Sequence, residues 1–126
     1  MRPIKGGMSR DPRKLKAFVI ADALVLDVYR ETKGMPAEER YGLQSQIRRG
    51  AVSVAANLVE GCARRSERDY LHFVGIAISS ASEVRYLIGL AARLGFADSP
   101  VCERLAERYG DVVRALQSLV TSVRSA

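Results

Sequence analysis

One stretch of the chain, residues 43–61, has an apolar set and a polar set of side chains that both recur with the period of one helix. Its apolar side chains recur at three- and four-residue steps and therefore share one face of a helix. They are Leu43, Ile47, Ala51, Val54 and Leu58. Its polar side chains keep the same spacing and form a second line. They are Gln46, Arg49, Ser53, Asn57 and Glu60. A helix with two such faces meets two different neighbours, so this stretch predicts the centre of a bundle that also self-associates.

The polar line has two further interpretations. Ser53, Asn57 and Glu60 could satisfy each other, or serine and arginine groups on the next helix, in a seam that fixes the packing register. The line could also bind a ligand. Assembly, register and ligand binding therefore stay open for these residues.

The helix before this stretch and the stretch itself have recognisable ends. Asp11 followed by proline is a fair N-cap, so the first helix is expected from about Pro12 to Lys33, with Gly34 as its stop. Its core face is expected to be Leu15, Phe18, Ala21 or Asp22, Val25, Val28 or Tyr29, and Thr32. Gly61 is expected to end the second helix as its C′ glycine.

The last two helices also have start and stop signals. Ser66 and Asp69 have the spacing of a capping box that opens a third helix, and Gly95 ends it. Ser99 is expected to cap a fourth helix, with Pro100 at its first position. Short loops join the four segments, and no run of alternating apolar and polar residues predicts a β-strand. Residues 12–126 therefore predict one all-α domain, an antiparallel up-down-up-down four-helix bundle.

Most of the chain's positive charge lies in its first residues. Residues 1–16 have a net charge of +5, whereas the whole chain of 126 residues has +6. Residues 1–11 also contain Pro3, Gly6 and Gly7 and are expected to form a disordered basic arm. Such an arm can hold a phosphate backbone or the acidic surface of a partner, or it can be a solubilising extension.

The arginines of the folded part form two groups, which are candidates for nucleic-acid contact. One group is Arg48 and Arg49, and the other is Arg64, Arg65 and Arg68. The alternative is a solvated turn with ion pairs between subunits. The aromatic residues fall mostly on core stripes, so the stacking platforms of single-strand binders are not expected.

The sequence predicts neither an enzyme nor a metal or cofactor site. Asp69 and His72 form one carboxylate-x-x-His pair, whereas a di-metal bundle needs two Glu-x-x-His motifs and two further carboxylates. Cys62 and Cys102 are isolated thiols without Cys-x-x-Cys spacing. No catalytic triad or phosphate-binding glycine loop is recognisable. The start of the chain lacks a secretory apolar segment and the apolar runs are short, so a cytoplasmic protein without a membrane helix is expected.

Three runs of the chain resemble a known family. They are YGLQSQIRRGAVSVAANLVEG, the preceding VYRETKGMP and the following RRSERDYLHFVGIAISSASEV. They are similar to the bacterial four-helix-bundle proteins first noticed as products of intervening sequences in large-subunit ribosomal RNA genes. The resemblance covers about residues 18–96. The chain departs from the family at Phe18, Gly50 and Ser79, where tryptophan, alanine and glycine are common.

The resemblance implies a ring-like homopentamer whose biochemical role is unassigned in most members. One similar branch, the accessory variability protein of diversity-generating retroelements, is a basic pentameric barrel that binds a reverse transcriptase and nucleic acid. The body of the present chain is nearly neutral, which weakens that parallel. The leading hypothesis is a non-enzymatic homo-oligomeric scaffold or accessory factor that associates with RNA or DNA. The alternative is an adaptor that recruits a polymerase or a ribosome-linked protein partner.

Overall fold

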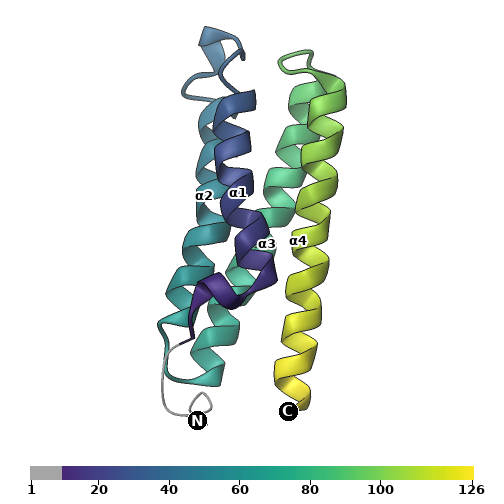
Figure 1. Cartoon of the computed structure of the whole chain (residues 1–126). Helices are drawn as coiled ribbons and strands as arrows, with labels where there is room; N and C mark the ends of the chain where they lie inside the picture. Colours follow the sequence, from purple (N-terminus) through teal and green to yellow (C-terminus); the bar gives the residue numbers. More distant parts are fainter. Residues whose placement is uncertain (1–9) are drawn as a thin grey trace.

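Four long helices pack side by side in the computed structural model, which describes residues 10–126 (Figure 1). They are α1 (Lys16–Glu31), α2 (Leu43–Cys62), α3 (Glu67–Arg93) and α4 (Ser99–Ser125). Two short 3-10 helices, η2 (Pro12–Lys14) and η3 (Ala37–Glu39), precede α1 and α2. Within residues 10–126 there is no β-strand, which confirms the all-α prediction.

Successive helices run in opposite directions, so the bundle has two distinct ends (Figure 1). The α2–α3 end holds the turn between those helices, the segment before α1 and the C-terminus of the chain. The α1–α2 end holds η3 and, beside it, the connection from α3 to α4. Because α1 is shorter than the other helices, the segment Arg10–Leu15 covers part of the bundle near the α2–α3 end.

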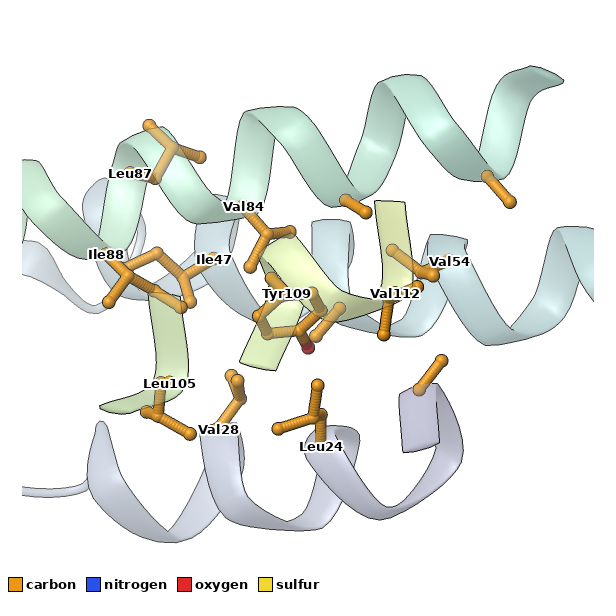
Figure 2. Packing of buried hydrophobic residues seen from close by; sticks show 14 of the residues in the cluster. Leu24, Val28, Ile47, Val54, Val84, Leu87, Ile88, Leu105, Tyr109 and Val112 are labelled. Atoms are coloured by element: carbon orange, nitrogen blue, oxygen red, sulfur yellow. The ribbon is translucent and has the colours of Figure 1, made fainter. Parts of the chain in front are cut away.

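The apolar stripes meet in one core, as the helical spacing predicts. All five apolar residues of the α2 stripe are buried. Figure 2 shows Tyr109 of α4 at the centre, between Leu24 and Val28 of α1, Ile47 of α2 and Val84 of α3. Tyr109 is fully buried.

The prediction for the first helix is wrong at both ends. The chain forms η2 and then an extended residue, Leu15 (φ −88°, ψ 118°), before α1 begins at Lys16. α1 ends at Glu31 and Thr32 caps it, two residues before Gly34. Asp11 is an N-cap as predicted, but of η2, where its carboxylate accepts from the backbone N–H of Arg13 at 3.0 Å.

The buried face of α1 agrees in part with the predicted stripe. The buried residues of this helix are Ala17, Ala21, Leu24 and Val28, and Thr32 is buried at its C-cap. Ala21, Val28 and Thr32 lie at predicted positions, whereas Ala17 and Leu24 do not. The predicted Leu15 and Phe18 are partly buried against the core.

Gly61 lies inside α2 and is not a C′ residue. It is buried, and α2 continues to Cys62 with Ala63 as the C-cap. A Cβ atom at Gly61 would lie 3.0 Å from the Cβ of Phe73 and 3.3 Å from the carbonyl oxygen of Tyr70. The glycine is therefore needed for the close approach of α2 and α3.

Substitution of Gly61 tests this close approach. Gly61→Val lowers the free energy of unfolding by about 1–3 kcal/mol, because the added methyl groups overpack the contact with Phe73. Gly75 in α3 is a matched control, since a Cβ there meets no atom within 4 Å. Gly75→Ala raises the free energy of unfolding by up to about 1 kcal/mol through helix propensity. Urea denaturation measures both; equal effects at the two positions would contradict the close-approach explanation.

The third helix is terminated by the predicted glycine, Gly95, whereas the N-cap of the fourth helix lies one residue before the predicted Ser99. Gly95 has φ 75°, and the backbone N–H groups of Gly95 and Phe96 bond back to α3 in a Schellman motif. The N-cap of α4 is Asp98, whose carboxylate accepts from the N–H of Val101 at 3.1 Å. Ser99 is therefore the first helical residue, because the stronger acceptor, one position earlier, takes the capping role.

α3 is long and apolar enough to cross a bilayer by length and composition, although the sequence predicts no membrane helix. Its buried residues lie in the core between α2 and α4, the helices that it contacts. They are Tyr70, Val74, Ala77, Ala81, Val84, Leu87, Ile88 and Ala91. The core helix of a soluble protein passes the same test, and 33% of the apolar window of α3 is buried, so this one helix is weak evidence of a membrane span.

Candidate functional site

The predicted polar line of α2 is divided by the packing. Ser53 and Asn57 lie half-buried against α3. The hydroxyl oxygens of Ser53 and Ser80 are 2.9 Å apart, and the Asn57 amide donates to the Ser53 carbonyl at 2.8 Å and to its hydroxyl at 3.0 Å. These three residues form a polar seam inside one chain, which is the geometry that the register interpretation requires.

The other members of the line face outward. Glu60 accepts from Arg64, one turn further along the chain, at 2.7 Å in an exposed pair. The side chains of Gln46 and Arg49 are exposed and have no hydrogen-bond or ion-pair partner within residues 10–126. Coverage of these outward residues by a second copy of the chain remains a prediction.

Arg48 has a structural role that its sequence position does not reveal. Its Nε donates to the Thr32 hydroxyl at 2.9 Å and its Nη2 to the carbonyl of Tyr29 at 3.1 Å. Gln44, one turn earlier in α2, donates to the carbonyl of Thr32 at 2.7 Å. Together they satisfy carbonyls at the C-terminus of α1, where cations are also favoured by the helix dipole. Thr32 is the buried polar residue that receives both contacts.

The second arginine group lies at the α2–α3 end. Arg64 pairs with Glu60 and stacks over the ring of Phe73 with 4.8 Å between guanidinium carbon and ring centroid. Arg65 and Arg68 are exposed and have no acidic partner within residues 10–126. Two of the three arginines are therefore available for phosphate, and the third is partly engaged.

The basic segment before α1 is fixed at this same end. The backbone N–H of Arg10 bonds to the carbonyl of Cys62 at 2.8 Å, and its guanidinium lies 3.8 Å from the ring centroid of Tyr70. Residues 10–16 have four basic side chains and one acidic side chain, whereas residues 60–69 have three of each. The positive excess of the α2–α3 end thus comes from residues 10–16. The predicted disordered arm otherwise falls on residues 1–9, which are outside the described range.

Within this segment one charge is already compensated. Arg13 bonds to the carboxylate of Asp11 at 3.0 Å, and this hydrogen bond holds the pKa of Asp11 below its ordinary value. Lys14 and Lys16 are exposed and make no ion pair with the described residues. Four cations in the segments at the α2–α3 end therefore have no ion-pair partner within residues 10–126: Lys14, Lys16, Arg65 and Arg68.

Asp69 and His72 do not form a metal site with other described residues. Within residues 10–126 no group of three or more His, Cys, Asp and Glu side chains is placed to hold a metal ion. Both residues are exposed, and the ring of His72 contacts Phe73 edge-on at 5.2 Å between centroids. The backbone N–H of Asp69 bonds to the Ser66 hydroxyl at 3.1 Å, as the capping box predicts.

Cys62 and Cys102 are buried free thiols, and burial raises the pKa of each. The unfolded chain loses these protons first as the pH rises, so the folded state binds more protons above the unfolded thiol pKa of about 8.5. We therefore expect the free energy of unfolding to fall between about pH 8.5 and pH 9.5. Urea denaturation across this range measures the free energy of unfolding. In a Cys62→Ala/Cys102→Ala variant this free energy should depend less steeply on pH. Equal profiles would contradict the assignment to the thiols.

An exposed apolar face lies on α1 and α2, and the sequence patterns did not predict it. Its large side chains are Val19, Leu26, Tyr29, Val52 and Val59, each at least 41% exposed. The Arg48 guanidinium lies over the Tyr29 ring at 4.6 Å, which fixes the two antiparallel helices in register. By helical steps from that contact, Leu26 lies near the level of Val52 and Val19 near that of Val59. We call these five residues the α1–α2 apolar face.

Comparisons with known proteins agree with the sequence resemblance. The profile of a family described as 23S rRNA-intervening sequence protein matches residues 13–118. Among solved structures, a similar one is the 1.70 Å crystal structure of a protein of unknown function from the S23 ribosomal protein family of Bacteroides thetaiotaomicron. It has a TM-score of 0.77 and 19% identity, and the match covers 82% of this chain and 97% of that one. This similarity supports the fold alone. The comparison with curated proteins gives no match.

Proposed function

This chain belongs to the family of 23S rRNA-intervening sequence proteins, and we propose that it is a non-enzymatic, self-associating accessory protein that holds RNA at its α2–α3 end. One observation carries the proposal: the bundle topology brings the basic segment before α1 to the turn that holds Arg65 and Arg68. The two segments that carry Lys14, Lys16, Arg65 and Arg68 are far apart in sequence and meet near one end of the molecule.

The surface cations of the α2–α3 end suit a phosphate backbone. Each Lys or Arg that replaces counterions on a nucleic acid contributes to affinity without reading its sequence. A single chain offers only a few such contacts, so its affinity is modest. The proposed self-association repeats the α2–α3 end and lets weak contacts add through avidity.

The α1–α2 apolar face is the surface that we propose for self-association. Monomeric soluble proteins rarely expose large contiguous apolar patches unless they serve an interface. A second copy of the chain is the proposed occupant, and the family resemblance supports this choice because it implies a homopentameric ring. The polar line of α2 then lies beside the contact, with Arg49 at its edge.

RNA binding is measured by the fluorescence anisotropy of a labelled single-stranded RNA over a range of salt concentrations. We expect the logarithm of the affinity to fall linearly with the logarithm of salt concentration. Arg65→Glu/Arg68→Glu weakens binding by roughly 10-fold or more and lowers the salt slope by about 2 per chain.

The control is Arg93→Glu/Arg104→Glu, which changes the net charge equally at sites away from the α2–α3 end. Its binding should remain closer to that of the natural chain. Equal weakening in both variants would show that only net charge matters. Absence of binding at low ionic strength would remove the RNA proposal altogether.

The alternative function is an adaptor that recruits a polymerase or a ribosome-linked protein. The α1–α2 apolar face favours it, because apolar side chains suit a protein partner more than a phosphate backbone. Capture of partners from lysate before and after nuclease treatment separates the two functions. A partner that survives nuclease supports the adaptor, and one that is lost supports an RNA bridge.

A further inference from the structure

A solvent-open hollow of about 350 Å³ lies at the α1–α2 end, opposite the proposed RNA surface. Its walls come from the α1–α2 connection and the first two turns of α2. The lining residues are Lys33, Met35, Pro36, Ala37, Arg40, Gln44 and Arg48. Three of these side chains are cationic, one is an amide and none is acidic. The charged side chains of the lining are therefore all basic, while Glu31, Glu38 and Glu39 of the same region lie outside the lining.

The positive charge of this hollow is not compensated by the described residues. Lys33 and Arg40 are exposed and make no ion pair within residues 10–126. The nearby carboxylate of Glu39 accepts from the backbone N–H of Leu43 at 3.0 Å and lies outside the lining set. An anion that enters the hollow therefore does not compete with a resident carboxylate.

Arg48 is oriented before any ligand arrives. Its Nε and Nη2 hold the C-terminus of α1 through Thr32 and Tyr29, and the Tyr29 ring lies against its guanidinium. The outer edge of the guanidinium, including Nη1, donates to no acceptor within residues 10–126. A planar fork held in this way offers paired donors to oxygen atoms at little further entropic cost.

We propose that this hollow binds the phosphate group of a phosphomonoester or pyrophosphate ligand. A tetrahedral dianion can accept from the Arg48 fork while Lys33 and Arg40 neutralise its charge. The Gln44 amide already donates to Thr32 and closes the inner wall. A volume of about 350 Å³ is in the range of small-ligand pockets and accommodates more than a bare ion. The site is independent of the RNA surface, because the two lie at opposite ends of the bundle.

The test uses the full chain and two probes, inorganic phosphate and pyrophosphate, measured by isothermal titration at constant ionic strength set with chloride. We expect one site per chain with a dissociation constant near or below roughly 1 mM. Lys33→Gln/Arg40→Gln should weaken binding at least 10-fold. Neither side chain makes a hydrogen bond or ion pair with the described residues, so this variant keeps the fold.

The matched control is Arg93→Gln/Arg104→Gln, which removes the same charge elsewhere and should retain the site. Absence of binding by both probes, or equal binding in both variants, overturns the proposal.

A second arm compares RNA oligonucleotides with a 5′-phosphate and with a 5′-hydroxyl. A 5′-phosphate preference that is lost in Lys33→Gln/Arg40→Gln identifies an RNA terminus as the source. Site-dependent binding of the free probes without that preference identifies a free phosphate ligand.

Discussion

Replacing Tyr109 with alanine should lower the free energy of unfolding by about 3–5 kcal/mol, the largest single-residue loss expected in this chain. Tyr109 is fully buried at the centre of the bundle, where its ring contacts side chains of the other helices (Figure 2). Truncation to a methyl group leaves a cavity that all four helices line, so the rigid packing around it relaxes only partly.

Tyr109→Phe should behave in the opposite way. The Tyr109 hydroxyl is buried and has no hydrogen-bond partner within residues 10–126, and burial raises its pKa. Removing it keeps the packed ring and eliminates an unsatisfied polar group, so stability should be unchanged or higher by about 1 kcal/mol. Urea denaturation followed by far-ultraviolet circular dichroism at one protein concentration measures both variants. A loss of more than about 1 kcal/mol in Tyr109→Phe would mean that the hydroxyl has a partner, and would contradict this account.

Leu26→Asp/Val59→Asp should convert the proposed assembly into a monomer of 13.8 kDa. Both residues belong to the α1–α2 apolar face and are exposed in the single chain, at 64% and 45%. The substitutions therefore spare the core but place unpaired charges in a contact between copies. Such charges should weaken association by roughly 100-fold or more.

The matched control places two aspartates on another exposed apolar site. Tyr86→Asp/Leu94→Asp replaces side chains that are 60% and 52% exposed near the far end of α3. Its mass by light scattering should equal that of the natural chain. Equal dissociation of both variants, or a natural chain that is monomeric at micromolar concentration, would exclude the α1–α2 apolar face as the self-contact.

The helical periods predicted the fold because large side chains decide which face of a helix is buried. The α2 stripe from Leu43 to Leu58 reached the core at every position. The buried face of α1 was predicted in part, since Ala21 and Val28 lie on the predicted stripe and Leu24 does not. The break at Leu15 was missed because the segment before α1 is bonded to the end of α2, a contact between segments far apart in sequence. Gly61 looked like a helix stop, since a buried close approach and a C′ position both favour glycine.

The candidate sites were harder to predict, because their contacts join segments far apart in the chain. Arg48 was a predicted nucleic-acid contact, and its structural partners, Tyr29 and Thr32, lie 19 and 16 residues away. Lys33 and Arg40 gave no signal because the hollow that they share with Arg48 forms only in the folded chain. The polar spacing of α2 included Ser53 and Asn57, while Ser80, the partner of Ser53 across the seam, could only be identified in the folded bundle.

The most direct test of the RNA proposal is ultraviolet crosslinking of the full chain to RNA, with the crosslinked peptides identified by mass spectrometry. The bundle topology predicts crosslinks in residues 10–16 and 64–68, two segments that meet at the α2–α3 end. Crosslinks confined to other parts of the bundle, or none at low salt, would contradict the placement of RNA on this surface.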